Sequence, residues 1–372
     1  KRQETVKVGT GLLNNHWTFD ARLSNIGTDG YIDRASVDLN SYYLQGGYFA
    51  ENTSVKLIAF AGKEKTYHAW GYATKEEMEK FGRRYNPCGE MYTDADGNKH
   101  YYTDQTDNYL QKNYQLLLNH SFSTAWNLNV ALHYTKGDGY YEEYKPGSSL
   151  VEYGLKPFNP DGTETNESDL VRQKKMGNKF GGGVFSLNYT GNRLTASLGG
   201  GLNQYRGNNF GKVTWVKNYI GNLSPEHEYY RNKSKKTDGN IYLKANYDLT
   251  STLSAYADLQ YRHIDYTIDG VNDKYDWNKN ALRPLAVDKK FDFFNPKVGL
   301  NWNITPNHRL YASFSVAQKE PTRNNYTDGD PDSYPKAEKL LDYEAGYTFA
   351  NPWLTAGANF YYMDCLLYTS PS

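Results

Sequence analysis

Aromatic side chains in polar stretches of the chain are the best candidates for contacting a ligand. The sequence holds 36 Tyr, 15 Phe and 7 Trp, which together make up 16% of its residues. Tyr and Trp each offer a large apolar surface with one polar group, which suits recognition of a bulky organic molecule. The candidates are Trp70, Tyr72, Tyr85, Tyr101, Tyr102, Tyr140, Tyr141, Trp215, Tyr229, Tyr230, Trp277 and Tyr326.

Residues that serve in catalysis or metal binding form no motif of known spacing. The glycine runs 181–183 and 199–201 fall inside predicted strands rather than before helices, so they are not phosphate-binding loops. The two cysteines show neither a disulfide framework nor a metal-ligand spacing. We interpret the neighbouring carboxylates of Glu142 and Glu143 as a solvated loop face. The sequence therefore predicts no enzyme, no cofactor and no metal site.

Charge and hydropathy narrow the class of protein further. The 42 basic residues equal the 42 acidic ones, so no overall basic surface points to nucleic acid. Local basic groups lie at Arg83-Arg84 and at Lys233, Lys235 and Lys236. We interpret them as solvated loops, and the alternative is that they attract an anionic chelate or outer-leaflet lipopolysaccharide. Mean hydropathy is −0.83, and no apolar run approaches the roughly 18 residues that a transmembrane helix requires.

Apolar and polar residues alternate in many segments, as they do in strands with one apolar face. Leu300 and Trp302 share one face, for example, whereas Asn301 and Asn303 share the other. About fourteen segments have this character. They span residues 3–12, 16–28, 36–50, 54–70, 107–122, 126–141, 176–189, 193–205, 238–249, 252–267, 291–304, 309–318, 340–349 and 354–364.

Two kinds of connection alternate between these segments. Short turns, such as Asn14-Asn15 and Thr190-Gly191-Asn192, consist of residues that favour turns. After each pair of segments joined by a short turn, a long polar stretch leads to the next pair. They are residues 29–35, 71–106, 142–175, 206–237, 268–290 and 319–339. Short periplasmic turns on one rim and long extracellular loops on the other are typical of bacterial outer-membrane barrels. The fold class predicted is all-β, an antiparallel transmembrane β-barrel.

The bilayer explains why one face of each strand is apolar. Lipid offers no hydrogen-bond partner to the backbone, so strands cross it only in a closed barrel. Apolar side chains then face lipid, and charged ones such as Lys244, Asp258 and Lys297 face the lumen. Trp126 and Trp302, beside short turns, are expected in an aromatic girdle at the membrane surface.

Several segments resemble TonB-dependent receptors of the Bacteroidetes type, over residues 3–364. The runs that carry the resemblance include Phe19-Asp20-Ala21-Arg22-Leu23-Ser24, Gly137-Asp138-Gly139-Tyr140-Tyr141-Glu142, Asp342-Tyr343-Glu344 and Asn359-Phe360-Tyr361-Tyr362-Met363-Asp364. The resemblance implies a barrel of roughly 22 strands, about 14 of them present here, filled by an N-terminal plug. Ligand would bind at the extracellular mouth.

Residues 1–364 are then expected to be part of such a barrel, without the plug, the first strand or strands and the last strands. Residues 365–372 break the alternation, and we expect them to be a non-native tail that forms no strand. The resemblance further implies the Gram-negative, Bacteroidetes-like outer membrane as the location. The partners would be outer-membrane lipid, a nutrient ligand, and the TonB–ExbB–ExbD complex, which would act through an N-terminal segment absent here.

The expected function is active import of a scarce nutrient, such as a siderophore–iron complex, cobalamin or a similar compound. Two alternatives remain open. One is a passive pore, or a structural or adhesive barrel, with no plug and no coupling to TonB. The other is a glycan-importing receptor of the SusC kind.

Overall fold

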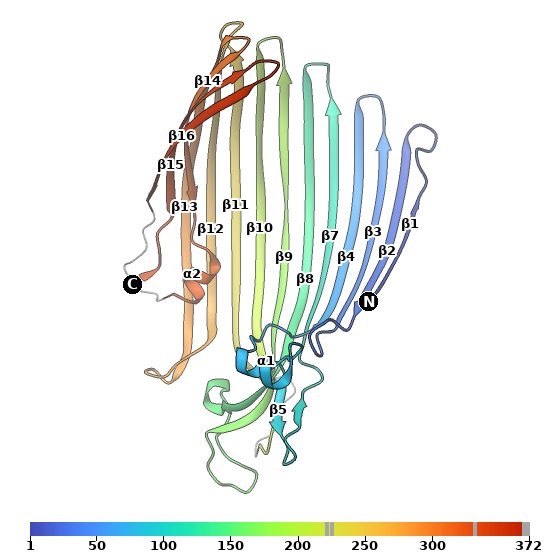
Figure 1. Ribbon diagram of the computed structural model, residues 1–372, viewed down its shortest axis with the longest axis vertical. Helices are drawn as coiled ribbons and strands as arrows, with labels where there is room; N and C mark the ends of the chain where they lie inside the picture. The colour runs from blue at the N-terminus through green and yellow to red at the C-terminus, as the bar shows by residue number, and fades with distance from the viewer. Residues whose placement is uncertain (220–222, 224–226, 330–332, 367–372) are drawn as a thin grey trace.

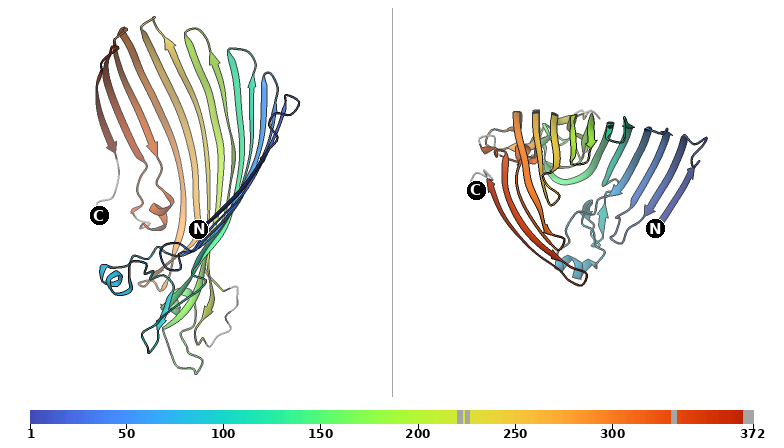
Figure 2. Two further views of the ribbon diagram at one scale, coloured as in Figure 1. Left: turned by 45° about the vertical axis from the view of Figure 1, so that its right-hand side comes forward. Right: turned by 90° about the horizontal axis from the view of Figure 1, so that it is seen from above.

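The computed structural model describes residues 1–219, 223, 227–329 and 333–366. Within them, fourteen strands form one antiparallel sheet in which every strand pairs with its neighbours in chain order. The sheet is a tall, curved and open wall (Figures 1 and 2). Its strands are β1 (Arg2–Gly9), β2 (Trp17–Thr28), β3 (Val37–Phe49), β4 (Thr53–Tyr67), β7 (Thr106–Ser121), β8 (Trp126–Ser149), β9 (Glu167–Thr190), β10 (Leu194–Val216), β11 (Glu228–Asp248), β12 (Leu253–Asp276), β13 (Ala281–Thr305), β14 (His308–Lys319), β15 (Glu338–Ala350) and β16 (Thr355–Leu366).

The remaining elements are short and lie in the connections. Between β4 and β7 the chain forms helix α1 (Lys75–Phe81) and a hairpin of β5 (Glu90–Thr93) and β6 (Lys99–Tyr101). The 3-10 turn η1 (Leu150–Tyr153) follows β8, and helix α2 (Arg323–Thr327) follows β14. Across the described part of the chain, no helix has the length and apolar character needed to span a membrane.

The two kinds of connection lie at opposite rims, as predicted. In Figure 1 the tight turns are at the top, whereas α1, β5 and the long loops are at the bottom. Local chemistry favours the tight turns. Asn14 and Asn15, between β1 and β2, have φ angles of 47° and 61°, and Asn tolerates this left-handed region better than most residues.

The predicted division of the faces is confirmed by the strand register. Lys244, Asp258 and Lys297 lie directly opposite one another on β11, β12 and β13. Leu300, on the other face of β13, is aligned with Ala255 and Ala312 and is 49% exposed. The charged face is the concave one, because side chains from β9 and β12 meet on it across two intervening strands. We call the other, apolar face the convex face.

Strands β8 to β13 extend much further toward the long loops than predicted. The predicted loops 142–175 and 206–237 are partly strand, and the predicted loop 268–290 is wrong. Only residues 277–280 separate β12 from β13. In these extensions lipid no longer sets the pattern: Ile264 and Ile268, on the same face of β12 as Asp258, are buried among the connections. The backbone pairing of the sheet continues there.

The end of β16 also departs from the expectation that Cys365–Ser372 forms no strand. Cys365 and Leu366 continue β16 and pair with Leu340 and Lys339 of β15. Backbone pairing needs no alternation of side chains, which is why the pattern missed it. Residues 367–372 of this segment lie outside the described part of the chain.

Candidate functional site

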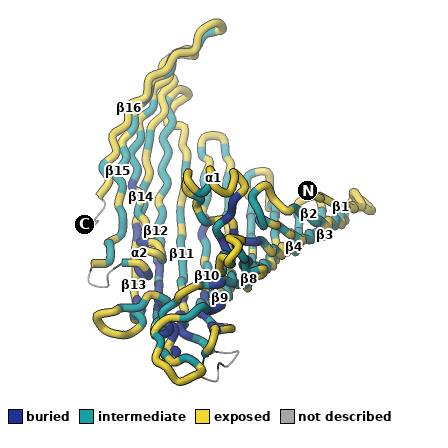
Figure 3. Tube along the Cα trace, turned by 60° about the horizontal axis from the view of Figure 1, so that its bottom comes forward, coloured by how far each residue is buried: buried dark blue, intermediate teal, exposed yellow. Residues whose placement is uncertain are grey.

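Buried side chains gather at the long-loop rim rather than along the wall (Figure 3). Two apolar clusters hold the connections against the ends of the strands. The first comprises Leu150, Tyr153, Leu155, Leu170, Val213, Val216, Tyr229 and Tyr230. The second comprises Ile264, Tyr266, Ile268, Leu285, Val287, Phe293 and Tyr326. The loops therefore have a core of their own, which orders their outer surface.

The first two long connections are fastened to each other. The guanidinium group of Arg34, between β2 and β3, lies 3.4 Å from the centre of the Tyr101 ring and donates a hydrogen bond to the carbonyl of Asn86. The side-chain amide of Asn86 donates to the carbonyls of Asp33 and His68, at 3.0 and 2.9 Å. This junction fixes the segment that contains His68 and Trp70.

An aromatic and charged group of side chains lies next to this junction. We call His68, Trp70, Tyr141, Lys174 and Asp273 the mouth cluster. The His68 and Trp70 rings stack at 3.8 Å, and the Tyr141 ring meets Trp70 edge-on at 5.6 Å. The Lys174 ammonium lies 5.8 Å from the Tyr141 ring centre and pairs with the Asp273 carboxylate. Aromatic surface beside a cation suits an anionic organic ligand.

His68 is the most unusual member of the mouth cluster. It is 2% exposed, yet neither ring nitrogen has a hydrogen-bond partner in the structure. Burial lowers the pKa of this imidazole from its usual value, against the opposing effect of Glu143 and Asp107. The imidazole stacks on the Trp70 ring, so His68 helps to hold that ring in place.

A second ion pair lies next to the mouth cluster, two residues further along β8 and β9 toward the long loops. Arg172 on β9 bonds to the carboxylate of Glu143 on β8 at 2.7 Å and donates to the Tyr153 hydroxyl at 3.1 Å. Both charged side chains are about four-fifths or more buried, with 15% and 14% exposed. The interpretation of Glu142 and Glu143 as a solvated face is wrong, because Glu142 also accepts hydrogen bonds from Tyr102 and Gln173. Their partners lie far away in sequence, which is why no local pattern revealed them.

The exposed aromatic candidates fall at separate places on the rim. Trp70 is 52% exposed in the mouth cluster, and Tyr72 is 97% exposed two residues later. Trp215 is 44% exposed at the end of β10 and stacks on Tyr144. Trp277 is 59% exposed in the turn between β12 and β13. Only Trp70 of these four is in the mouth cluster.

The half-buried candidates divide between the two faces of the wall. Tyr141 lies opposite Lys174 on the concave face, whereas Tyr140 lies opposite Lys175 on the convex face. Tyr101 is covered by Arg34. Tyr102 donates to Glu142, and both burial and this carboxylate raise its pKa.

The buried candidates pack the loops. Tyr85, Tyr229 and Tyr230 are 8–9% exposed, and Tyr229 and Tyr230 contact each other at 5.0 Å. Tyr326 in α2 is 1% exposed and meets Tyr266 at 5.8 Å. These buried rings support the outer surface of the loops.

The interpretation of the basic residues near β11 as a loop is wrong, although Lys233 and Lys235 are exposed. Lys233, Lys235 and Lys236 lie within β11. Lys236 pairs with Glu320, which also accepts a hydrogen bond from Arg262 at 3.1 Å. This network ties the start of the connection after β14 to the concave face.

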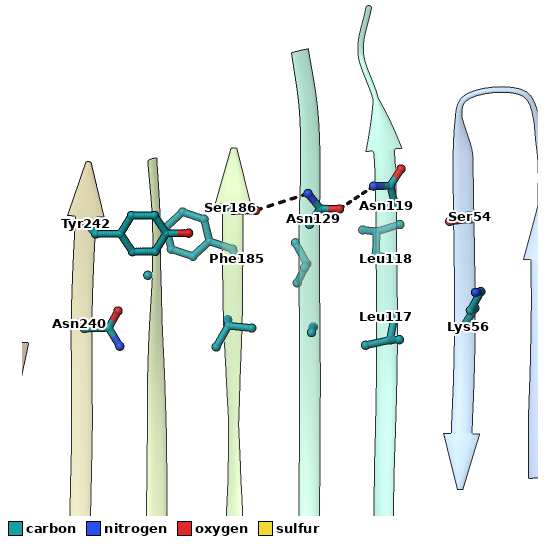
Figure 4. A pocket seen from close by; sticks show the side chains of 14 residues that line it. Ser54, Lys56, Leu117, Leu118, Asn119, Asn129, Phe185, Ser186, Asn240 and Tyr242 are labelled. Atoms are coloured by element: carbon teal, nitrogen blue, oxygen red, sulfur yellow. Dashed lines mark hydrogen bonds between the residues drawn. The ribbon is translucent and has the colours of Figure 1, made fainter. Parts of the chain in front are cut away.

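Further along the concave face, toward the short turns, six strands line a hollow of about 480 Å³ (Figure 4). Asn119 donates to Asn129 at 2.5 Å, and Asn129 donates to Ser186 at 3.4 Å. Lys56 and Tyr242 border the same hollow. The concave face is therefore wet and hydrogen-bonded well below the mouth. The described residues hold no group of three or more His, Cys, Asp or Glu arranged around a metal position.

Comparison with solved structures shows the same fold in iron-transport receptors. The chain superposes on the ferric-catecholate import receptor Fiu from E. coli K12 in its open form, with a TM-score of 0.64, 13% identity, and coverage of 98% of this chain and 57% of that one. It superposes on the unliganded ferric citrate transporter FecA with a TM-score of 0.65, 11% identity, and coverage of 98% and 48%. For the ferric yersiniabactin uptake receptor FyuA from Yersinia pestis the values are 0.63, 10%, 98% and 52%.

The chain thus spans about half the length of these receptors. No curated protein matches the sequence. A family model described as "TonB dependent receptor-like, beta-barrel" matches residues 63–364, which include every strand from β7 to β15. With its fourteen-stranded antiparallel wall, apolar on one face and polar on the other, the chain belongs to the family of TonB-dependent receptor β-barrels.

Proposed function

We propose that the full protein imports a scarce nutrient across the outer membrane, driven by the TonB complex. In this proposal residues 1–364 form part of a larger barrel, which a plug fills and further strands close. The observation that carries the proposal is the pairing of a polar concave face with an ordered, aromatic mouth. Family membership supports the energy source, because the family takes its name from dependence on TonB.

The chemistry of the mouth cluster favours an anionic iron chelate as the ligand. Trp70 is half exposed and held rigidly by His68 and the Arg34 junction. Lys174, which is paired with Asp273, places an ammonium group beside the half-buried ring of Tyr141. Catecholate and citrate complexes of iron, the ligands named for two of the similar receptors, combine negative charge with a compact organic shell. Cobalamin is larger and lacks that negative charge.

Uptake by whole cells tests the proposal. A strain carrying only this receptor is given radioactive ferric citrate, a ferric catecholate complex or cobalamin, each with TonB intact and with TonB deleted. We expect uptake of an iron chelate that falls to background when TonB is deleted. Undiminished uptake without TonB would refute the proposal and support a passive pore.

The same strain separates the remaining alternative. Growth on oligosaccharides as the sole carbon source, lost on deletion of the receptor, would support a glycan importer instead. No uptake of any tested solute, with the barrel present in the outer membrane, would support a structural or adhesive role.

A further inference from the structure

Five basic side chains form one continuous row on the convex face. They are Lys112 on β7, Lys136 on β8, Lys179 on β9, Arg206 on β10 and Lys235 on β11, and we call them the basic row. Each is directly opposite the next in the register of the sheet. All five are exposed, and their strands stand side by side in the middle of the wall (Figure 1).

The row lies on the side of the sheet that faces lipid. Next to it, two residues along β7 and β8, come Tyr114 and Tyr134, which lie opposite each other. Leu116 and Leu132 follow in the next position on the same face. From the row toward the short turns, the convex face therefore changes from basic to aromatic to apolar.

The height of the row matches the headgroups of the outer leaflet. Lys136 follows Trp126 by ten residues on β8, and Trp126 packs against Tyr189 beside the short turns. Ten residues cover about 34 Å along a strand. With the tilt of about 40° that is usual in such barrels, the rise is about 26 Å, close to the apolar band of about 25 Å. The row thus begins where the apolar band ends.

Protein partners neutralise little of this charge. Lys136 pairs with Asp138 at 3.3 Å, and the Arg206 Nε donates to Gln204 at 2.7 Å. Lys112, Lys179 and Lys235 make no ion pair within the described residues. At the β12 end of the row, Thr267 lies opposite Lys235, with Asp265 and Asp269 two residues to either side.

Such a row opposes folding unless an anion occupies it. Directly opposite side chains in a sheet are about 5 Å apart at Cβ, well inside the screening length of about 8 Å at physiological salt. Like charges in that position repel. Phosphate is the anion with the matching chemistry at this height, because Lys and Arg bind it through short, charge-assisted hydrogen bonds.

We propose that the basic row binds the phosphate groups of the outer-leaflet glycolipid, lipid A. The inference rests on the proposed function in one respect, the placement of the wall in the outer membrane. The lipid's phosphates lie against the row, and its acyl chains lie along the Tyr114–Tyr134 band and the apolar surface beneath. The glycolipid then contacts all five strands from β7 to β11.

Native mass spectrometry of the full-length protein tests this. The purified protein in detergent is mixed with equal amounts of diphosphorylated lipid A and its dephosphorylated form. We expect the wild type to retain the phosphorylated form about tenfold more. The variant K112Q/K136Q/K179Q/R206Q/K235Q should retain the two forms equally. A matched variant, K75Q/K80Q/R83Q/K156Q/K279Q, removes four lysines and one arginine from the connections and should keep the wild-type preference.

Equal retention of the two lipids by the wild type would overturn the proposal, and so would an unchanged preference in the five-residue variant. Folding of each variant is checked by its heat-modifiable migration on gels. If the five-residue variant fails this check, K179Q/R206Q, at the centre of the row, is used with the same expectation of a reduced preference. Absence of the protein from the outer membrane would refute the proposed function. Normal insertion and uptake without a preference for phosphorylated lipid A would refute only the proposal that the basic row binds lipid A.

Discussion

The ammonium group of Lys174 on β9 forms an ion pair with the carboxylate of Asp273 near the end of β12. Strands β10 and β11 lie between the two residues. Both side chains are mostly buried, at 20% and 25% exposed. The pair therefore links β9 to β12 across the concave face near the long-loop rim, and it holds the Lys174 ammonium group beside Tyr141.

Removing this cation should weaken binding of an anionic chelate. We expect Lys174→Met to reduce the affinity for the transported iron chelate about tenfold, the loss of one charge-assisted hydrogen bond. Lys175→Met is the matched control, because Lys175 is the next residue but lies over Tyr140 on the convex face. Equilibrium binding to the full-length protein measures both. Equal losses in the two variants would show that Lys174 acts only through overall charge.

Trp70 should contribute more to binding than any other exposed tryptophan at this rim. Trp70→Ala removes a stacked surface, and we expect affinity to fall about five- to tenfold. Trp277→Ala is the control. Trp277 has a similar exposure to Trp70, and its ring packs against the Tyr275 ring at 4.8 Å. Binding should be unchanged in that variant. A larger effect at Trp277 than at Trp70 would place the ligand elsewhere on the rim.

The ring of Tyr326 should keep α2 docked on the wall. Tyr326→Ala leaves a cavity in a buried cluster, and a change of this kind costs about 3–5 kcal/mol. We expect faster cleavage by an added protease within residues 320–337, with heat-modifiable migration of the barrel unaltered. Tyr326→Phe retains the ring and its contacts with Tyr266 and Tyr334, so its cleavage should match the wild type. Similar cleavage of all three proteins would mean that other contacts hold α2.

The environment of His68 should make the mouth sensitive to acid. Burial lowers the pKa of this imidazole in the folded protein, so the unfolded segment binds a proton at higher pH than the folded one does. The stability of the packing around Trp70 is therefore complete above about pH 6.5 and is lost as pH falls through the lowered pKa.

Tryptophan fluorescence between pH 7.5 and 5 follows this change. The fluorescence of the wild type should change within this pH range. The variant His68→Phe keeps an aromatic ring stacked on Trp70 but has no imidazole to protonate, so the change should be absent. Identical profiles in both proteins would show that the transition does not come from His68.

The membrane-spanning part of the fold was predictable because lipid imposes a rule on every residue there. Alternate positions such as Leu300 and Asn301 face different media, so their order reveals the strand and its faces. The tight turn at Asn14-Asn15 was visible for a similar reason, since few residues accept its backbone angles.

The candidate site was predictable only in part. Tyr140 and Tyr141 were both expected to contact ligand, but they point to opposite faces of β8. Beyond the membrane no lipid distinguishes one face of a strand from the other, so the sequence pattern does not separate Tyr140 from Tyr141. The burial of Tyr229 and Tyr230 depends on η1 and the end of β9, whose packing is set by contacts between distant segments. The ligand role of the mouth cluster remains a prediction.

The wall has an uneven height, and this affects how a ligand is captured. Strands β8 to β13 have 21–25 residues, whereas β1 to β4 have 8–15 and β14 to β16 have 12 or 13. Much of the surface above the membrane is thus already sheet, and its conformational entropy was lost when the barrel folded. Only the tips of the connections remain to be ordered when a ligand arrives, which lowers the entropic cost of association. Under the proposed function, receptor and ligand would meet as two nearly rigid bodies, and selectivity among ligands would depend on how well their shapes match.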